Sequence, residues 1–272
     1  MYGPDGTPAG DEIPVSGTGD CLTPTDIDWA AWGGFGVAWI GEGMVRARLF
    51  GSDGAAVTDE IPVPSVGEAE QSNPAISMTT DGFVVVWAQP DAILGTRFRS
   101  DGTPVSDVRV WDSEDSEARW PSVCAYPGHG FVIAWGIFDT SEDSGEVVGR
   151  WYYESGASTS GPYGLGSDPA GGGLWPAVDM AANGSVRAVW HFHGGDDSGI
   201  AFRTFLGEAS PAGEERRIDA YEEGHQAFPR VSVHSDGRAA ACWVSDGQDG
   251  DGYGIFCQRL DASGSPLGLL AW

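Results

Sequence analysis

The sequence contains no lysine. All 14 basic residues are arginine, against 40 Asp and Glu residues, and the formal net charge is −26. A surface of this sign repels phosphate backbones, so we expect no nucleic-acid partner, and anionic membrane surfaces are disfavoured for the same reason. No apolar run approaches the ~20 residues of a membrane-spanning helix, so we expect no membrane insertion. No signal peptide is visible either.

Metal and catalytic motifs are also missing. The sequence contains no CxxC pair, which argues against a zinc site. It has no nucleophile elbow, no zincin motif and no phosphate-binding loop. No stretch shows sustained helical periodicity, so we expect very little helix.

Tryptophan is abundant, with 12 copies, and five of them mark an internal repeat. Each repeat has a Pro, an alternating strand, a Gly-containing turn, an apolar strand ending in Trp, a variable loop and a strand carrying Arg. A repeat of roughly fifty residues with four short strands is typical of one propeller blade. The anchors are Trp39, Trp87, Trp135, Trp190 and Trp243; the prolines are Pro24, Pro74, Pro121, Pro176 and Pro229; the arginines are Arg48, Arg97, Arg150, Arg203 and Arg259.

The repeats predict an all-β chain that forms a single five-bladed β-propeller with four antiparallel strands per blade. Their cores span residues 24–73, 74–120, 121–175, 176–228 and 229–272, and residues 1–20 form a closing strand. The segment near residues 12–15 has the sequence of a fourth strand, so we expect it to pair with the last repeat and hide a sheet edge. The C-terminal segment DASGSPLGLLAW is a second candidate for that place, and both stay open. A β-sandwich is the alternative architecture.

Repeat five, WVSDGQDGDGYGIFCQRLDASGSPLG, resembles a repeat of large secreted and surface proteins of bacteria, often adhesin-like chains with calcium-binding segments. The resemblance covers most of the chain at the level of the repeat and is specific in repeat five alone. It implies an extracellular or cell-surface module and no catalytic residue.

One face of the predicted propeller carries short, uniform Asp-Gly and Asn-Gly turns, and the other carries loops of variable length. Binding residues concentrate on variable loops held by a rigid scaffold, so we expect the site on the second face. Trp120, Trp175 and Phe228 each directly precede a blade-opening Pro, and Trp32 lies near the same point of blade one. Such aromatics either stack on sugar rings or wedge between blades.

These features predict a non-enzymatic binding or adhesion module of an exported or surface protein, with a carbohydrate or a protein as partner. A purely structural propeller in a larger assembly is one alternative. A five-bladed glycoside hydrolase is the other, for which the first strands offer Asp26, Asp28 and Asp179, with His234 nearby. The sequence leaves the oligomeric state open.

The loop of repeat five is rich in glycine and carries Asp246, Asp249 and Asp251. Ca²⁺ takes several oxygen ligands from short flexible loops, so these residues form a candidate calcium site. The Glu that would close an EF-hand loop is missing, and a solvated loop of Asp-Gly turns is the alternative interpretation.

The cysteines of repeat five flank the same loop symmetrically. A symmetric hairpin therefore places Cys242 directly opposite Cys257. The register allows either a disulfide or two packed thiols. Cys21 and Cys124 belong to other blades, and we expect both to be unpaired.

Overall fold

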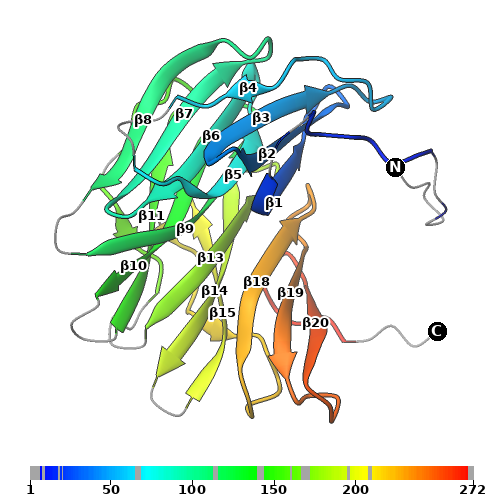
Figure 1. The fold of residues 1–272 in the computed structure, drawn as a ribbon. Helices are drawn as coiled ribbons and strands as arrows, with labels where there is room; N and C mark the ends of the chain where they lie inside the picture. The colour runs from blue at the N-terminus through cyan, green and yellow to red at the C-terminus, as the bar shows by residue number, and fades with distance from the viewer. Residues whose placement is uncertain are drawn as a thin grey trace.

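The computed structural model is all-β, and five antiparallel sheets surround a common axis as the blades of a propeller (Figure 1). The structure describes residues 7, 10–17, 19, 21–64, 69–112, 116–139, 144–159, 161–166, 172–194, 197–207 and 210–268. These residues form no helix, so none of them belongs to a helix that could cross a membrane. The predicted five-bladed fold is confirmed.

The blades follow one another along the chain. Blade one contains β1 (Cys21–Trp29), β2 (Phe35–Gly41), β3 (Met44–Phe50) and β4 (Ile61–Pro62). Blade two contains β5 (Ser72–Met78), β6 (Gly82–Gln89), β7 (Ala92–Arg99) and β8 (Pro104–Asp112). Blade three contains β9 (Glu117–Tyr126), β10 (Gly130–Asp139), β11 (Ser144–Tyr152) and β12 (Tyr163–Gly164).

Blades four and five differ at their outer edges. Blade four contains β13 (Gly173–Met180), β14 (Ser185–Gly194) and β15 (Asp197–Leu206), and two short strands, β16 (Ser210–Pro211) and β17 (Arg216–Arg217), pair with β15. Blade five contains β18 (Gln226–Val233), β19 (Ala239–Asp246) and β20 (Tyr253–Leu260), and no fourth strand pairs with β20 among the described residues.

The hydrophobic core lies between the blades. Each of four interfaces buries the anchor Trp of one blade against apolar residues of the blade before it. The anchors Trp39, Trp87, Trp135, Trp190 and Trp243 are at most 5% exposed, as the repeat predicts. The packing of first strands runs from β1 through β5, β9 and β13 to β18, and β18 contacts β1 less extensively than these consecutive first strands contact one another.

The N-terminal segment covers the free flank of blade one. Ile13 and Val15 pack against a cluster that includes Trp39, and Arg48 donates to the carbonyl oxygen of Val15 at 3.0 Å. Arg150 makes the same bond to Val110 of the preceding blade, and Arg203 makes it to Leu165. Residues 11–17 therefore sit where the fourth strand of a preceding blade sits, although they form no ladder with β20.

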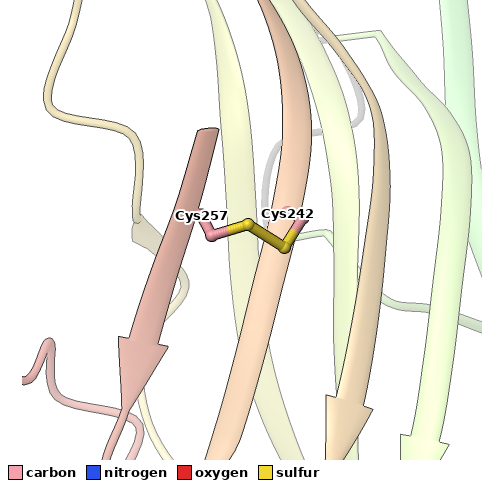
Figure 2. The surroundings of a disulfide bond; sticks show 2 residues. All are labelled: Cys242 and Cys257. Carbon is pink, nitrogen blue, oxygen red and sulfur yellow. A yellow bond between two sulfur atoms is a disulfide. The ribbon is translucent and has the colours of Figure 1, made fainter. Parts of the chain in front are cut away.

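The hairpin of blade five has the predicted register. Cys242 lies directly opposite Cys257, and the two sulfurs form a disulfide that joins β19 to β20 (Figure 2). Cys21 and Cys124 are free, the first exposed and the second buried. Of the two alternatives that the register left open, the structure has the disulfide.

Candidate axial pocket

The five first strands enclose a pocket on the propeller axis with a volume of about 530 Å³. It is lined by residues 24–28, 73–77, 120–125, 175–179, 228 and 230–232. Every blade contributes the same stretch of chain, which begins near its opening Pro. The repeat therefore delivers five copies of one segment to a single cavity, and differences between the copies decide its chemistry.

Each first strand bulges at the start of that stretch, because its register with the second strand shifts there in all five blades. Bulges commonly redirect side chains beside functional sites. The residue before the Pro has a left-handed backbone in four blades, with φ of 51° at Asn73, 54° at Trp120, 49° at Trp175 and 53° at Phe228. Bulky residues rarely adopt this conformation, and such strain clusters at functional sites.

The strained aromatic residues form a continuous arc beside the pocket. The ring centroids of Trp120 and Trp175 are 5.1 Å apart, and those of Trp175 and Phe228 are 4.5 Å apart. The rings are tilted by 54° and 45°, so they line a curved surface rather than a flat stack. We call these three residues the aromatic arc. The structure therefore brings together three of the four aromatic residues that were predicted as ligand contacts.

Trp32 does not join the arc. It lies in the turn between β1 and β2, at the opposite end of its blade, and its ring covers Gly34 of the same turn. It is 49% exposed. The expectation that Trp32 shares a site with the other three aromatics is corrected, because the matching position in blade one precedes Pro24 instead.

Three carboxylates line the pocket, and all of them bond to a neighbouring blade. The amide of Ile76 donates to Asp26 Oδ2 at 2.9 Å. Asp28 Oδ2 accepts the amide of Met78 at 2.7 Å and also a hydroxyl of blade two. Asp179 Oδ2 accepts the amide of Val233 at 2.6 Å. These carboxylates therefore join blades as well as line the cavity.

Two of the carboxyl groups have raised pKa values. Burial raises the pKa of Asp179 to about 6, opposed by the two backbone amides that it accepts and reinforced by the nearby charge of Asp28. Burial also raises the pKa of Asp26, against two backbone amides and the charge of Arg230. Carboxyl groups that hold a proton near neutral pH are a feature of active sites. The pocket thus contains a proton donor for weakly acidic conditions.

Among the described residues that line the pocket, Arg230 is the only one with a cationic side chain. On the second strand of its blade, Arg230 pairs with Cys242, the residue before the anchor Trp243. Asp26 pairs with Ala38, the residue before the anchor Trp39, so Arg230 and Asp26 occupy equivalent positions in their blades. Arg230 donates to the carbonyl oxygen of Pro229 at 2.9 Å. Asp28 and Asp179 also occupy equivalent positions in their blades, two residues further along the first strand and away from the arc.

The acidic loop of blade five is separate from this pocket. Asp246 ends β19, and its amide donates to the carbonyl oxygen of His225. Asp249 Oδ1 accepts the amide of Asp251 at 3.3 Å. No group of three or more His, Cys, Asp or Glu side chains is arranged for a metal ion in the part of the chain that the structure describes. The calcium site stays a prediction.

The sequence pointed to Asp26, Asp28 and Asp179 only as residues of first strands, and it missed Asn73 and Arg230 altogether. The signal for the latter two was available, since Asn73 directly precedes Pro74 and Arg230 directly follows Pro229. His234, which was noted beside the carboxylates, instead lies 2.9 Å from Asp236 in an exposed turn.

Comparisons with known proteins show the fold alone. No protein-family model matches the chain, and no curated protein is similar to it in sequence. A protein of unknown function from Dyadobacter fermentans has a similar structure, with a TM-score of 0.61 and 12% identity over 88% of this chain and 79% of that one. An α-L-arabinanase from Penicillium chrysogenum gives 0.54 and 12% over 84% and 72%. An exo-β-1,3-galactanase from Phanerochaete chrysosporium gives 0.50 and 11% over 97% and 64%.

These findings correct two expectations, that the chain is a non-enzymatic binding module and that it is not an enzyme. The arabinanase and the galactanase, two of the similar structures whose activity is named, are enzymes. The error arose because the sequence argument placed the site on the loops that vary most between repeats. The chemically distinctive residues gather on the axis, where the first strands of different repeats meet.

Proposed function

We propose that the chain is a glycoside hydrolase that works in its axial pocket. The observation that carries this proposal is the pairing of Asp179, a buried carboxyl with a pKa of about 6, with a second carboxyl, Asp26, in one cavity beside an aromatic arc. Glycosidases need two carboxyl groups that flank the scissile bond. Asp26 and Asp179 come from blades one and four, which are not neighbours in the ring.

Each residue has one role in the proposed reaction. The aromatic arc holds a sugar ring by stacking against its apolar face. The protonated carboxyl of Asp179 donates its proton to the glycosidic oxygen as the bond from the anomeric carbon to that oxygen breaks. A water molecule attacks the anomeric carbon, and the carboxylate of Asp26 accepts the proton that this water releases. The products are two shorter saccharides.

The similar structures supply the first substrates to try. They are named as an arabinanase in complex with arabinobiose and a galactanase in complex with galactotriose, so arabinan and β-1,3-galactan oligosaccharides are the natural starting panel. We also propose that the protein is exported, because the disulfide of blade five is the kind of bond that persists in oxidising compartments.

The test measures release of reducing ends from these oligosaccharides. We expect Asp179→Asn and Asp26→Asn each to lower kcat by at least about 100-fold, the usual contribution of a general acid or base. We expect activity to fall above about pH 6, where Asp179 loses its proton.

Ser122→Ala is the matched control. The Ser122 hydroxyl accepts the amide of Val178 at 3.2 Å, so it joins two blades from the pocket wall as the carboxylates do, but it cannot serve as the acid. This variant keeps its activity if the chemistry belongs to the carboxyl groups. Full activity in Asp179→Asn with an unchanged pH profile would overturn the assignment.

A further inference from the structure

The aromatic arc has the features of a cation-binding surface. Its three rings face different directions around a curve, with tilts of 54° and 45° between neighbours. Aromatic faces attract cations. Neighbouring rings of the arc touch one another, so an ammonium group would lie against the surface of the arc and not between its rings. Trp120 already makes such a contact, because the guanidinium carbon of Arg119 lies 5.8 Å from its ring centroid.

The charge beside the arc has the matching sign. Asp26, Asp28 and Asp179 line the same pocket, and Arg230 is the one cationic side chain among its lining residues in the described part of the chain. Arg119, which lies over Trp120, forms an ion pair with Glu117. The charge of Arg230 acts on Asp26, but no ion pair within 4.0 Å joins these two described residues, so Arg230 does not occupy the carboxyl group directly. The formal charge of −26 on the whole chain adds a field of the same sign, and such fields steer cationic ligands toward a cleft.

The imidazole of His191, which packs behind the arc, adds no opposing charge. His191 is buried, and its ring centroid is 5.3 Å from that of Trp175. Burial lowers the pKa of His191 to about 4, so its imidazole is neutral at the pH values where Asp179 carries a proton. A cation held against Trp175 therefore meets no repulsion from this histidine.

We propose that the mouth of the pocket selects an amino sugar, with the ammonium group of the sugar between the aromatic arc and Asp26. This inference rests on the proposed function, because it names the class of glycan that the same pocket accepts. Neutral sugars also stack on aromatic rings, so the distinguishing property is the dependence of binding on the positive charge of the ligand. Arg230 opposes that charge and limits the affinity.

The experiment compares two ligands that differ mainly in charge. Calorimetry at pH 5.5 measures the binding of a glucosamine trisaccharide and of the corresponding N-acetylated trisaccharide to the Asp179→Asn protein, which is not expected to hydrolyse either. We expect the glucosamine trisaccharide to bind at least tenfold more tightly, equivalent to about 1.4 kcal/mol. The preference shrinks in concentrated salt if it is electrostatic.

Three variants locate the site. In the same background, Trp175→Ala removes the middle ring and is expected to abolish the preference. Arg230→Gln removes the opposing charge and is expected to strengthen glucosamine binding severalfold. Trp32→Ala is the control, since this exposed Trp lies at the opposite end of its blade.

The outcomes separate this inference from the proposed function. Equal affinity for the two trisaccharides would overturn the amino-sugar assignment, and so would binding of tetramethylammonium as tight as that of the glucosamine trisaccharide. Either result is compatible with hydrolysis of neutral glycans by the wild type. Conversely, a charge-dependent preference that Trp175→Ala abolishes would support the site even if the wild type hydrolysed no glycan.

Discussion

Replacing Asp179 by Asn should stabilise the protein at alkaline pH. The pKa of Asp179 is raised from 3.8 to about 6, chiefly by burial, so the folded protein binds this proton more tightly than the unfolded chain does. The resulting stabilisation is complete below pH 3.8 and is lost as the pH rises through 6. Each pKa unit corresponds to about 1.4 kcal/mol, so ionised Asp179 costs up to about 3 kcal/mol at pH 8.

Asn is neutral like the protonated carboxyl and keeps a carbonyl oxygen for the amide of Val233, but its NH2 group cannot accept the amide of Met180, which Asp179 Oδ1 accepts at 2.7 Å. At pH 4.5 the variant should therefore be less stable than the wild type by about 1 kcal/mol, the contribution of one hydrogen bond. At pH 8 the variant should be more stable, and for a domain of this size the gain corresponds to a rise in Tm of roughly 5–10 °C. A residue that costs stability where it is ionised is typical of a functional position.

Thermal unfolding followed by circular dichroism from pH 4.5 to pH 8 measures this difference. Ser122→Ala is again the control, since the loss of its hydrogen bond should lower Tm by a similar amount at every pH. The reasoning would be refuted if Asp179→Asn were less stable than the wild type at pH 8, because Asp179 would then be a structural link between blades four and five.

The remaining predictions concern three other features. Replacing Cys242 and Cys257 together by Ala should cost about 3 kcal/mol of stability, as expected for a closed loop of about 15 residues, and the wild type should show two free thiols in denaturant; four would mean that the bridge is absent. Trp175→Gly should be more stable than Trp175→Ala by up to about 1 kcal/mol, because glycine adopts the left-handed conformation freely; equal melting temperatures would argue against strain. Millimolar Ca²⁺ should release or absorb heat on titration, and Asp249→Ala should abolish this signal if the loop binds the ion; a wild type without heat change or thermal shift would leave a solvated loop.

The blade and its hairpin register could be predicted from sequence because both are local. The strand pattern, the turn residues and the anchor Trp recur within each repeat, and every anchor is buried. The pairing of Cys242 with Cys257 follows from the length of one loop, so no distant contact is needed to place it. The N-terminal segment could be assigned as a fourth strand for the same reason. In the structure, the carbonyl oxygen of Val15 accepts a hydrogen bond from Arg48, as that of Val110 does from Arg150.

The misplacement of Trp32 shows where local reasoning stopped. Trp120, Trp175 and Phe228 directly precede a Pro, whereas Trp32 follows Pro24 by several residues. The strand that lies between them places Trp32 at the other end of the blade. A prediction that required each aromatic residue to directly precede the opening Pro, as the other three do, would have excluded Trp32.

The sequence by itself determined the repeat, the fold and the residue types on each first strand. Only the tertiary structure decided that Asp26 of blade one and Asp179 of blade four share a cavity and that their burial raises their pKa values. Spacing within one repeat carries no information about contacts across the axis, which depend on the closure of five sheets. The left-handed backbone of Trp120, Trp175 and Phe228 is likewise a property of the folded propeller, because each of these residues disfavours that conformation in isolation.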